Sequence, residues 1–137
     1  MFEYHGWIVV RYHTHDIDGA RQTDTWDAVL AHVESLGITG LLQMGRHNGL
    51  DVVGFHGLKN HRVEWPIALM RFVGETAPGS YGLLYVRDDE DPRGPGHDDT
   101  FLVWRLVRGR VDERADALLS PVIPTIEDPY DPSRPDG

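Results

Sequence analysis

Hydrophobic and polar residues follow the periods of two kinds of secondary structure along the first third of the chain. Residues 4–11 combine aromatic and β-branched side chains with a partial period of two, which predicts a strand. After a polar run, apolar residues recur every three or four positions, which predicts a helix with one buried face. The residues of that face are Trp26, Val29, Leu30, Val33 and Leu36. We expect Thr23 or Asp24 to cap the helix and Gly37 to end it.

The middle of the chain predicts a β-hairpin followed by a second helix. Residues 40–46 and 50–55 flank Asn48 and Gly49, two residue types that tolerate the positive φ angles of a type I′ turn. Pro66 suits the first turn of a helix, and the apolar residues after it form a broad hydrophobic face.

Two further strands complete the predicted order, which is βαββαββ. Residues 81–87 and 101–108 form these strands, on either side of a Pro/Gly/Asp loop too long for a tight turn. The fold class is therefore α+β, a mainly antiparallel sheet with both helices on one face, and its first six elements follow the ferredoxin-like order βαββαβ. Because five of the nine prolines lie in residues 121–137, we expect a single domain over 1–126, an extended Pro-rich C-terminal arm, and a loose acidic tail over 127–137.

Length and composition restrict the class of protein. A chain of 137 residues fits one domain, and the absence of cysteine excludes disulfides, thiolate metal sites and a cysteine nucleophile. There is no apolar run of the roughly 20 residues that cross a bilayer, and no signal-peptide pattern at the start. We therefore expect a cytoplasmic protein that does not interact with membranes.

Negative charge is concentrated in two short segments. The chain has 13 basic and 22 acidic residues, a net charge of −9; residues 87–99 contribute −4 and residues 127–137 contribute −3. Like charges slow association and opposite charges speed it. This distribution predicts a basic partner surface and no direct binding of nucleic acid.

The candidate partner-binding residues come from these segments and from one aromatic side chain. They are Asp88, Asp89, Glu90, Asp91, Trp104, Glu127 and Asp128. A tryptophan on a strand is a strong interface anchor when it is exposed. The alternatives stay open, because charge runs are usually solvated loops and tryptophans are usually buried.

Motifs for catalysis are sparse. The sequence contains neither a phosphate-binding loop nor a GxSxG nucleophile elbow. His13, His15, Asp16 and Asp18 could hold a metal ion, since an HxH pair on an extended segment points both rings to one side. The alternative is an exposed polar loop, because no spacing fixes further ligands. We expect no cofactor and no catalytic residue.

Several segments resemble the immunity protein 7 family of bacterial polymorphic toxin systems. The longest is APGSYGLLYVRDDED at residues 77–91. Other segments agree with the family in the same order: residues 2–7, 60–61, 101–104 with 108–109, and 119–121 leading to 123–128. The likeness therefore spans nearly the whole chain.

The resemblance implies a small cytoplasmic antitoxin that neutralises a cognate toxin by direct binding and has no catalytic residues. Such a toxin often acts on nucleic acid and then has a basic cleft, which the carboxylates of this chain would fit. The competing hypotheses are a small metal-dependent enzyme that uses the histidine segment, and an interaction domain unrelated to toxins.

Overall fold

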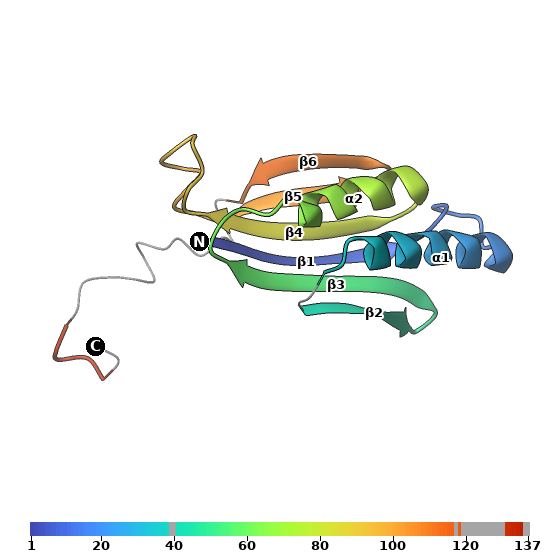
Figure 1. Ribbon diagram of the computed structural model, residues 1–137, viewed down its shortest axis with the longest axis horizontal. Coiled ribbons are helices and arrows are strands. Elements are labelled where there is room, and N and C mark those ends of the chain that lie inside the picture. Colours follow the sequence, from blue (N-terminus) through green and yellow to red (C-terminus); the bar gives the residue numbers. More distant parts are fainter. Residues whose placement is uncertain (39–40, 117, 119–130, 136–137) are drawn as a thin grey trace.

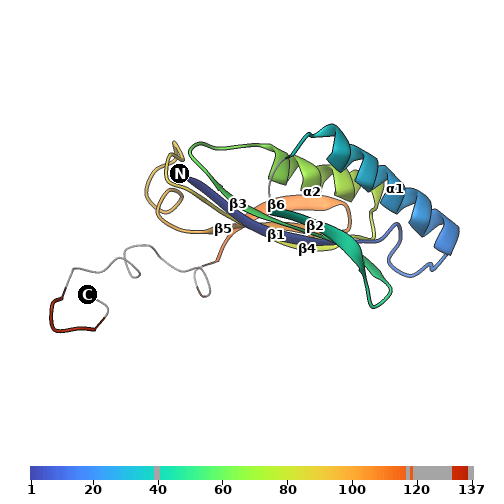
Figure 2. The same ribbon diagram turned by 60° about the horizontal axis from the view of Figure 1, so that its bottom comes forward.

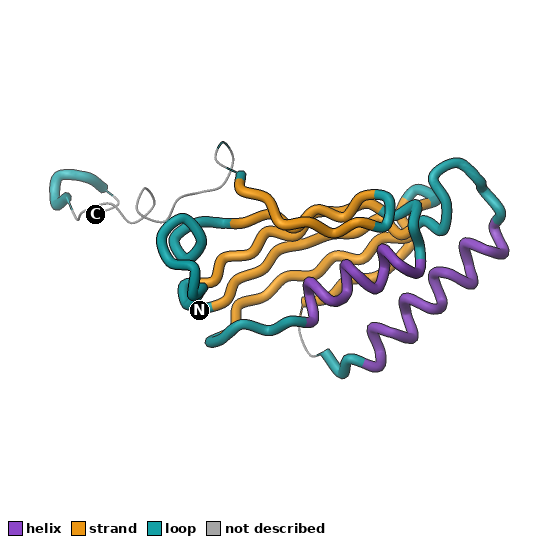
Figure 3. The backbone as a smooth tube through the Cα atoms, turned by 90° about the horizontal axis from the view of Figure 1, so that it is seen from above, coloured by secondary structure: helices purple, strands orange, loops and turns teal. Residues whose placement is uncertain are grey.

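A sheet covered on one face by two helices forms the body of the protein (Figure 1). The computed structural model describes residues 1–38, 41–116, 118 and 131–135. Its elements are β1 (Phe2–Val10), α1 (Gly19–Ser35), β2 (Leu41–His47), β3 (Leu50–Lys59), α2 (Trp65–Thr76), β4 (Tyr81–Asp88), β5 (Leu102–Val107) and β6 (Arg110–Ala115). Figures 2 and 3 show both helices on the same side of the sheet, lying next to each other.

The strands are paired in the order β2-β3-β1-β4-β5-β6, and every pair is antiparallel. The first four strands with the two helices form two interleaved βαβ units, which is the ferredoxin-like arrangement. β5 and β6 extend the sheet beyond β4. The predicted α+β class and the placement of both helices on one face are confirmed.

Period-two alternation along the central strand directs one set of side chains into the core. On β1, Phe2, Tyr4, Ile8 and Val10 are buried against the helices, while Glu3, His5, Trp7 and Val9 face the other way. Gly6 shares the helix side, and a Cβ there would lie only 2.8 Å from the Phe55 ring. A glycine at this position lets Phe55 of β3 and Leu84 of β4 fill the space.

The first helix begins earlier than predicted. Asp18, and neither Thr23 nor Asp24, is its N-cap, and the Asp18 carboxylate accepts hydrogen bonds from the amides of Ala20 and Arg21. The polar first turns of this helix hide its start from a search for apolar periodicity. Gly37, with φ of +59°, follows the helix as predicted.

The apolar face of that helix is only partly buried, in contrast to the prediction. Val29 and Val33 are buried, whereas Trp26, Leu30 and Leu36 remain partly exposed. The helix therefore packs on the sheet along a narrower stripe than the five-residue pattern suggests.

Both predicted hairpin strands and the second helix are confirmed, and a sixth strand is new. Asn48 and Gly49 have φ of +50° and +78° in the β2–β3 turn. Arg108 and Gly109, with φ of +48° and +75°, form an equivalent two-residue turn that returns the chain into β6. The sequence of β6 is RVDERA, and its charged residues mask the strand pattern.

The predicted C-terminal arm lies mostly outside the described residues, so the structure does not test it. No helix among the described residues is both long enough and apolar enough to cross a bilayer.

Candidate functional site

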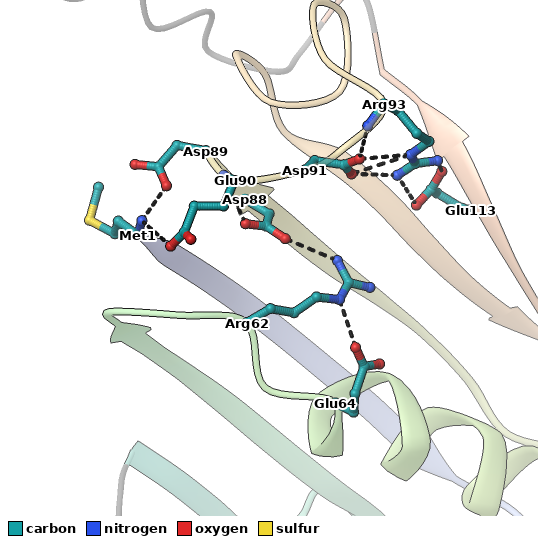
Figure 4. A network of polar contacts seen from close by, with 9 residues as sticks. All are labelled: Met1, Arg62, Glu64, Asp88, Asp89, Glu90, Asp91, Arg93 and Glu113. Carbon is teal, nitrogen blue, oxygen red and sulfur yellow. Dashed lines mark hydrogen bonds and ion pairs between the residues drawn. The ribbon is translucent and has the colours of Figure 1, made fainter.

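The acidic segment lies at the end of β4 and in the loop that follows, at the same end of the sheet as Met1 (Figures 1 and 4). Asp88 is the last residue of β4, and Asp89, Glu90 and Asp91 follow it. Asp88 and Asp91 are only 5% and 7% exposed, so this segment is not uniformly solvated. The four carboxylates divide into an inner pair and an outer pair.

Arg62 holds the first inner carboxylate. Its Nη1 lies 3.4 Å from Asp88 Oδ2, and its Nε donates to Glu64 Oε1 at 2.8 Å, so one guanidinium joins the end of β4 to the start of α2. The other oxygen of Asp88 accepts the backbone N–H of Glu90 at 3.1 Å. The buried Asp88 carboxylate therefore has two hydrogen-bond donors and fixes the start of the loop.

Arg93 holds the second inner carboxylate and bridges the loop to β6. Its Nη2 and Nε donate to Asp91 at 2.7 and 3.0 Å, and its Nη1 donates to Glu113 Oε1 at 2.6 Å. Bidentate charge-assisted pairs of this kind are strong and geometrically specific. The Arg93 hydrogen bonds lower the pKa of Asp91 to about 2, against the opposing effect of burial.

Asp89 and Glu90 form the outer pair, which is exposed to solvent. The amino group of Met1 contacts Asp89 and lies 3.8 Å from Glu90 Oε1, and His61 Nδ1 lies 2.8 Å from the same oxygen. The hydrogen bond from the Met1 amino group lowers the pKa of Asp89. Exposed pairs of this type contribute little to stability. Because both side chains are exposed, their carboxylates are accessible to a partner.

The network in Figure 4 is strongly negative. Its nine residues carry six carboxylates against two guanidiniums and the Met1 amino group, a net charge of −3 at neutral pH. The buried ion pairs hold the backbone of the loop, so the outer carboxylates are displayed from an ordered segment.

Trp104 lies beside this network, on the helix side of β5. Its ring is partly buried against the core, and the Arg71 guanidinium lies 5.6 Å from the ring centroid. Trp104, Asp88 and Asp91 line one shallow hollow with Pro92, Arg93, Arg62 and Glu113. The structure therefore brings Trp104 together with the acidic segment, although they are well separated in sequence. Glu127 and Asp128 lie outside the described residues.

The histidine segment has structural contacts of its own. The ring nitrogen Nδ1 of His13 accepts the backbone N–H groups of His15 and Asp16, at 3.1 and 2.8 Å, and Asp18 caps α1. Asp16 lies 3.6 Å from Arg21. Among the described residues, no group of three or more His, Asp or Glu side chains is arranged to hold a metal ion.

The face of the sheet opposite the helices contains exposed residues that the sequence interpretation did not select. Trp7 and Tyr81 are 41% and 39% exposed there, and their rings meet edge to face with centroids 5.9 Å apart. The alternation along β1 already indicates that Trp7 is exposed, because Trp7 shares the face of Glu3 and His5 and alternates with the buried Ile8. It was missed because tryptophans on strands are more often buried.

Comparison with known proteins identifies the class of protein. A model of a family of toxin-immunity proteins matches residues 1–128, which is nearly the whole chain. The chain belongs to that family, Immunity protein 7, and is an immunity protein directed against a toxin. No curated protein and no solved structure gives a significant match.

Proposed function

We propose that this protein neutralises its cognate toxin in the cytoplasm by direct protein–protein binding, with the acidic segment facing a basic surface of the toxin. The observation that carries the proposal is the family match over residues 1–128, because it assigns the whole folded body to toxin immunity. A toxin that acts on nucleic acid would offer such a basic surface.

The geometry of the acidic segment favours this role. The inner pair, Asp88 and Asp91, is used within the fold, and the outer pair, Asp89 and Glu90, is exposed. A binding segment that is ordered before association loses less conformational entropy on binding. The surrounding field of net charge −9 would also speed the encounter with a basic partner.

Trp104 is a second proposed contact. Its ring lines the hollow next to Asp88 and Asp91, where a basic side chain of the toxin would meet both an aromatic ring and carboxylates. Binding alone then accounts for immunity, and the proposed mechanism includes no turnover, no metal and no cofactor.

Charge neutralisation of the outer pair tests the proposal. We expect the Asp89→Asn/Glu90→Gln variant to associate several-fold more slowly with the toxin at low salt, and to show a weaker salt dependence than the parent. The matched control is Glu34→Gln/Glu75→Gln, which removes two exposed charges from the helices. Stopped-flow association at two ionic strengths measures both effects.

Equal association rates for the parent and the outer-pair variant at both salt concentrations would contradict the proposed contact. Asp88 and Asp91 are left unchanged, because their replacement would break buried ion pairs and confuse binding with folding.

A further inference from the structure

The sheet has a second surface, the open face, which is defined by the strand side chains that point away from the helices. Along β1 these are Glu3, His5, Trp7 and Val9, which alternate with the core residues. The antiparallel register puts Tyr81 of β4 opposite Val9, on the same face. Figures 2 and 3 show that neither α1 nor α2, the helices of the described residues, covers this side of the sheet.

The exposed large hydrophobic residues of the strands share one orientation. Among the described residues, four large hydrophobic strand residues are exposed, and all four have this orientation: Trp7, Leu50, Leu58 and Tyr81. Trp7 and Tyr81 are in contact, whereas Leu50 and Leu58 lie near the two ends of β3. A tryptophan and a tyrosine exposed side by side are frequent anchors of protein interaction sites.

Arginines of the β5–β6 hairpin lie on the side of Trp7 and Tyr81 that faces β5. The register directs Arg105, Arg110 and Arg114 to the open face, and Arg108 occupies the turn. Arg105 and Arg114 share Asp112, at 3.4 and 2.7 Å. Within the described part of the chain, neither Arg108 nor Arg110 forms an ion pair.

The hairpin is therefore a positive region in a negative protein. Residues 105–114 contain four arginines against Asp112 and Glu113, a net charge of +2, whereas the whole chain carries −9. In Figure 1 the β5–β6 turn lies at the opposite end of the sheet from the loop that follows β4. The two charged regions thus present opposite signs at opposite ends.

We propose that the open face is the main anchoring surface for the toxin, and that it binds a toxin patch with an apolar centre flanked by carboxylates. This inference rests on the proposed function. Trp7 and Tyr81 would cover the apolar centre, while Arg108 and Arg110 would pair with the carboxylates, because their guanidiniums have donors to spare. Tryptophan, tyrosine and arginine are the residue types that dominate binding energy in protein interfaces.

A protein partner fits this surface better than a nucleic acid does. A polyphosphate chain would meet four arginines but also a chain of net charge −9, with Glu3 on the same face. An apolar protein patch with local carboxylates avoids this repulsion. The open face and the acidic segment would then act differently: the aromatic anchors set the dissociation rate, and the outer pair sets the association rate.

Truncation of the anchors provides the test, with an inactivated form of the cognate toxin domain as the probe. We expect Trp7→Ala and Tyr81→Ala each to raise the dissociation rate at least tenfold. Ile17→Ala, which shortens an exposed apolar side chain in the loop before α1, is the matched control and should change it less than twofold. Surface plasmon resonance measures these rates.

The arginines are tested separately. Arg108→Gln/Arg110→Gln breaks no ion pair between described residues and should weaken binding at least fivefold. Lys59→Gln, which removes an exposed charge on the helix side of β3, should have little effect. Hydroxyl-radical footprinting of the parent complex needs no substitution. It should show oxidation of Trp7 and Tyr81 falling several-fold when the toxin domain is bound.

The outcomes separate this inference from the proposed function. If the parent binds the toxin but the open-face variants bind equally well and Trp7 stays reactive in the complex, the inference is wrong and the proposed function stands. If the parent does not bind the toxin at all, both are wrong. If Trp7→Ala instead abolishes self-association of the protein, or binding of a single-stranded RNA oligonucleotide, the open face has a different occupant.

Discussion

The two buried carboxylates of the acidic segment are held by arginines that each serve two acids. Asp91 is the clearest case, since Arg93 donates to both of its oxygens and also to Glu113 on β6. An unpaired charge at this depth would be costly, and the bidentate geometry offsets that cost. The same residues that give the segment its negative charge therefore also give it its shape.

The stabilising effect of Asp91 should depend on pH. Its folded pKa of about 2 lies below the ordinary value of 3.8, so the ionised form favours folding. The contribution of ionised Asp91 to the free energy of unfolding has its full value above about pH 4 and is lost as the pH falls from about 4 to about 2. We expect Asp91→Asn to lower the free energy of unfolding by on the order of 1 to 2 kcal/mol at pH 6, after allowance for solvent screening at the half-exposed Arg93, and by much less at pH 2.5.

Urea denaturation at the two pH values measures this difference. Asp27→Asn, an exposed change on α1, is the control and should have little effect at either pH. A loss of stability from Asp91→Asn that is the same at pH 6 and pH 2.5 would show that the ionised pair is not its cause.

At the scale of elements, the reliable predictions were those with a local signal. Asn48 and Gly49 specify a turn by their own backbone preferences, and the apolar run after Pro66 can only face a core. These local features are sufficient to predict the β2–β3 hairpin and α2. The first seven elements, from β1 to β5, and with them the α+β class, could therefore be predicted from the sequence.

The elements that were missed lie in polar or charged segments, which show no apolar period. The start of α1 depends on the Asp18 cap in a polar segment, and β6 is an edge strand of charged residues whose place depends on pairing with β5. The site depends instead on contacts between distant parts of the chain. The acidic run is visible in the sequence, but its division into an inner and an outer pair follows from Arg62 and Arg93, and the exposure of Trp7 follows from which face the helices cover.

The packing of α1 on the sheet gives a prediction at this scale. Val29 is fully buried, so Val29→Ala should reduce the free energy of unfolding by about 2 kcal/mol, through lost burial and the cavity that remains. Leu30→Ala should have a smaller effect, although leucine is the larger residue, because Leu30 is partly exposed. Chemical denaturation of both variants tests this order, and a larger loss for Leu30→Ala would mean that a different face of the helix meets the sheet.

The whole molecule has two surfaces suited to different parts of one binding process. The acidic segment at one end of the sheet carries accessible carboxylates on an ordered loop, and the open face carries aromatic side chains beside arginines. Long-range attraction by the first and anchoring by the second would together give fast and lasting inhibition. Both belong to a body that the family match assigns to toxin immunity.

Titration of active toxin with the purified protein, in buffer containing a metal chelator, tests the central claim most directly. Neutralisation by binding predicts that toxin activity falls linearly and reaches zero at a fixed molar ratio, whatever the incubation time. A toxin that loses activity progressively with substoichiometric protein would reveal catalytic inactivation, and a toxin unaffected by excess protein would show that direct binding is not the means of immunity.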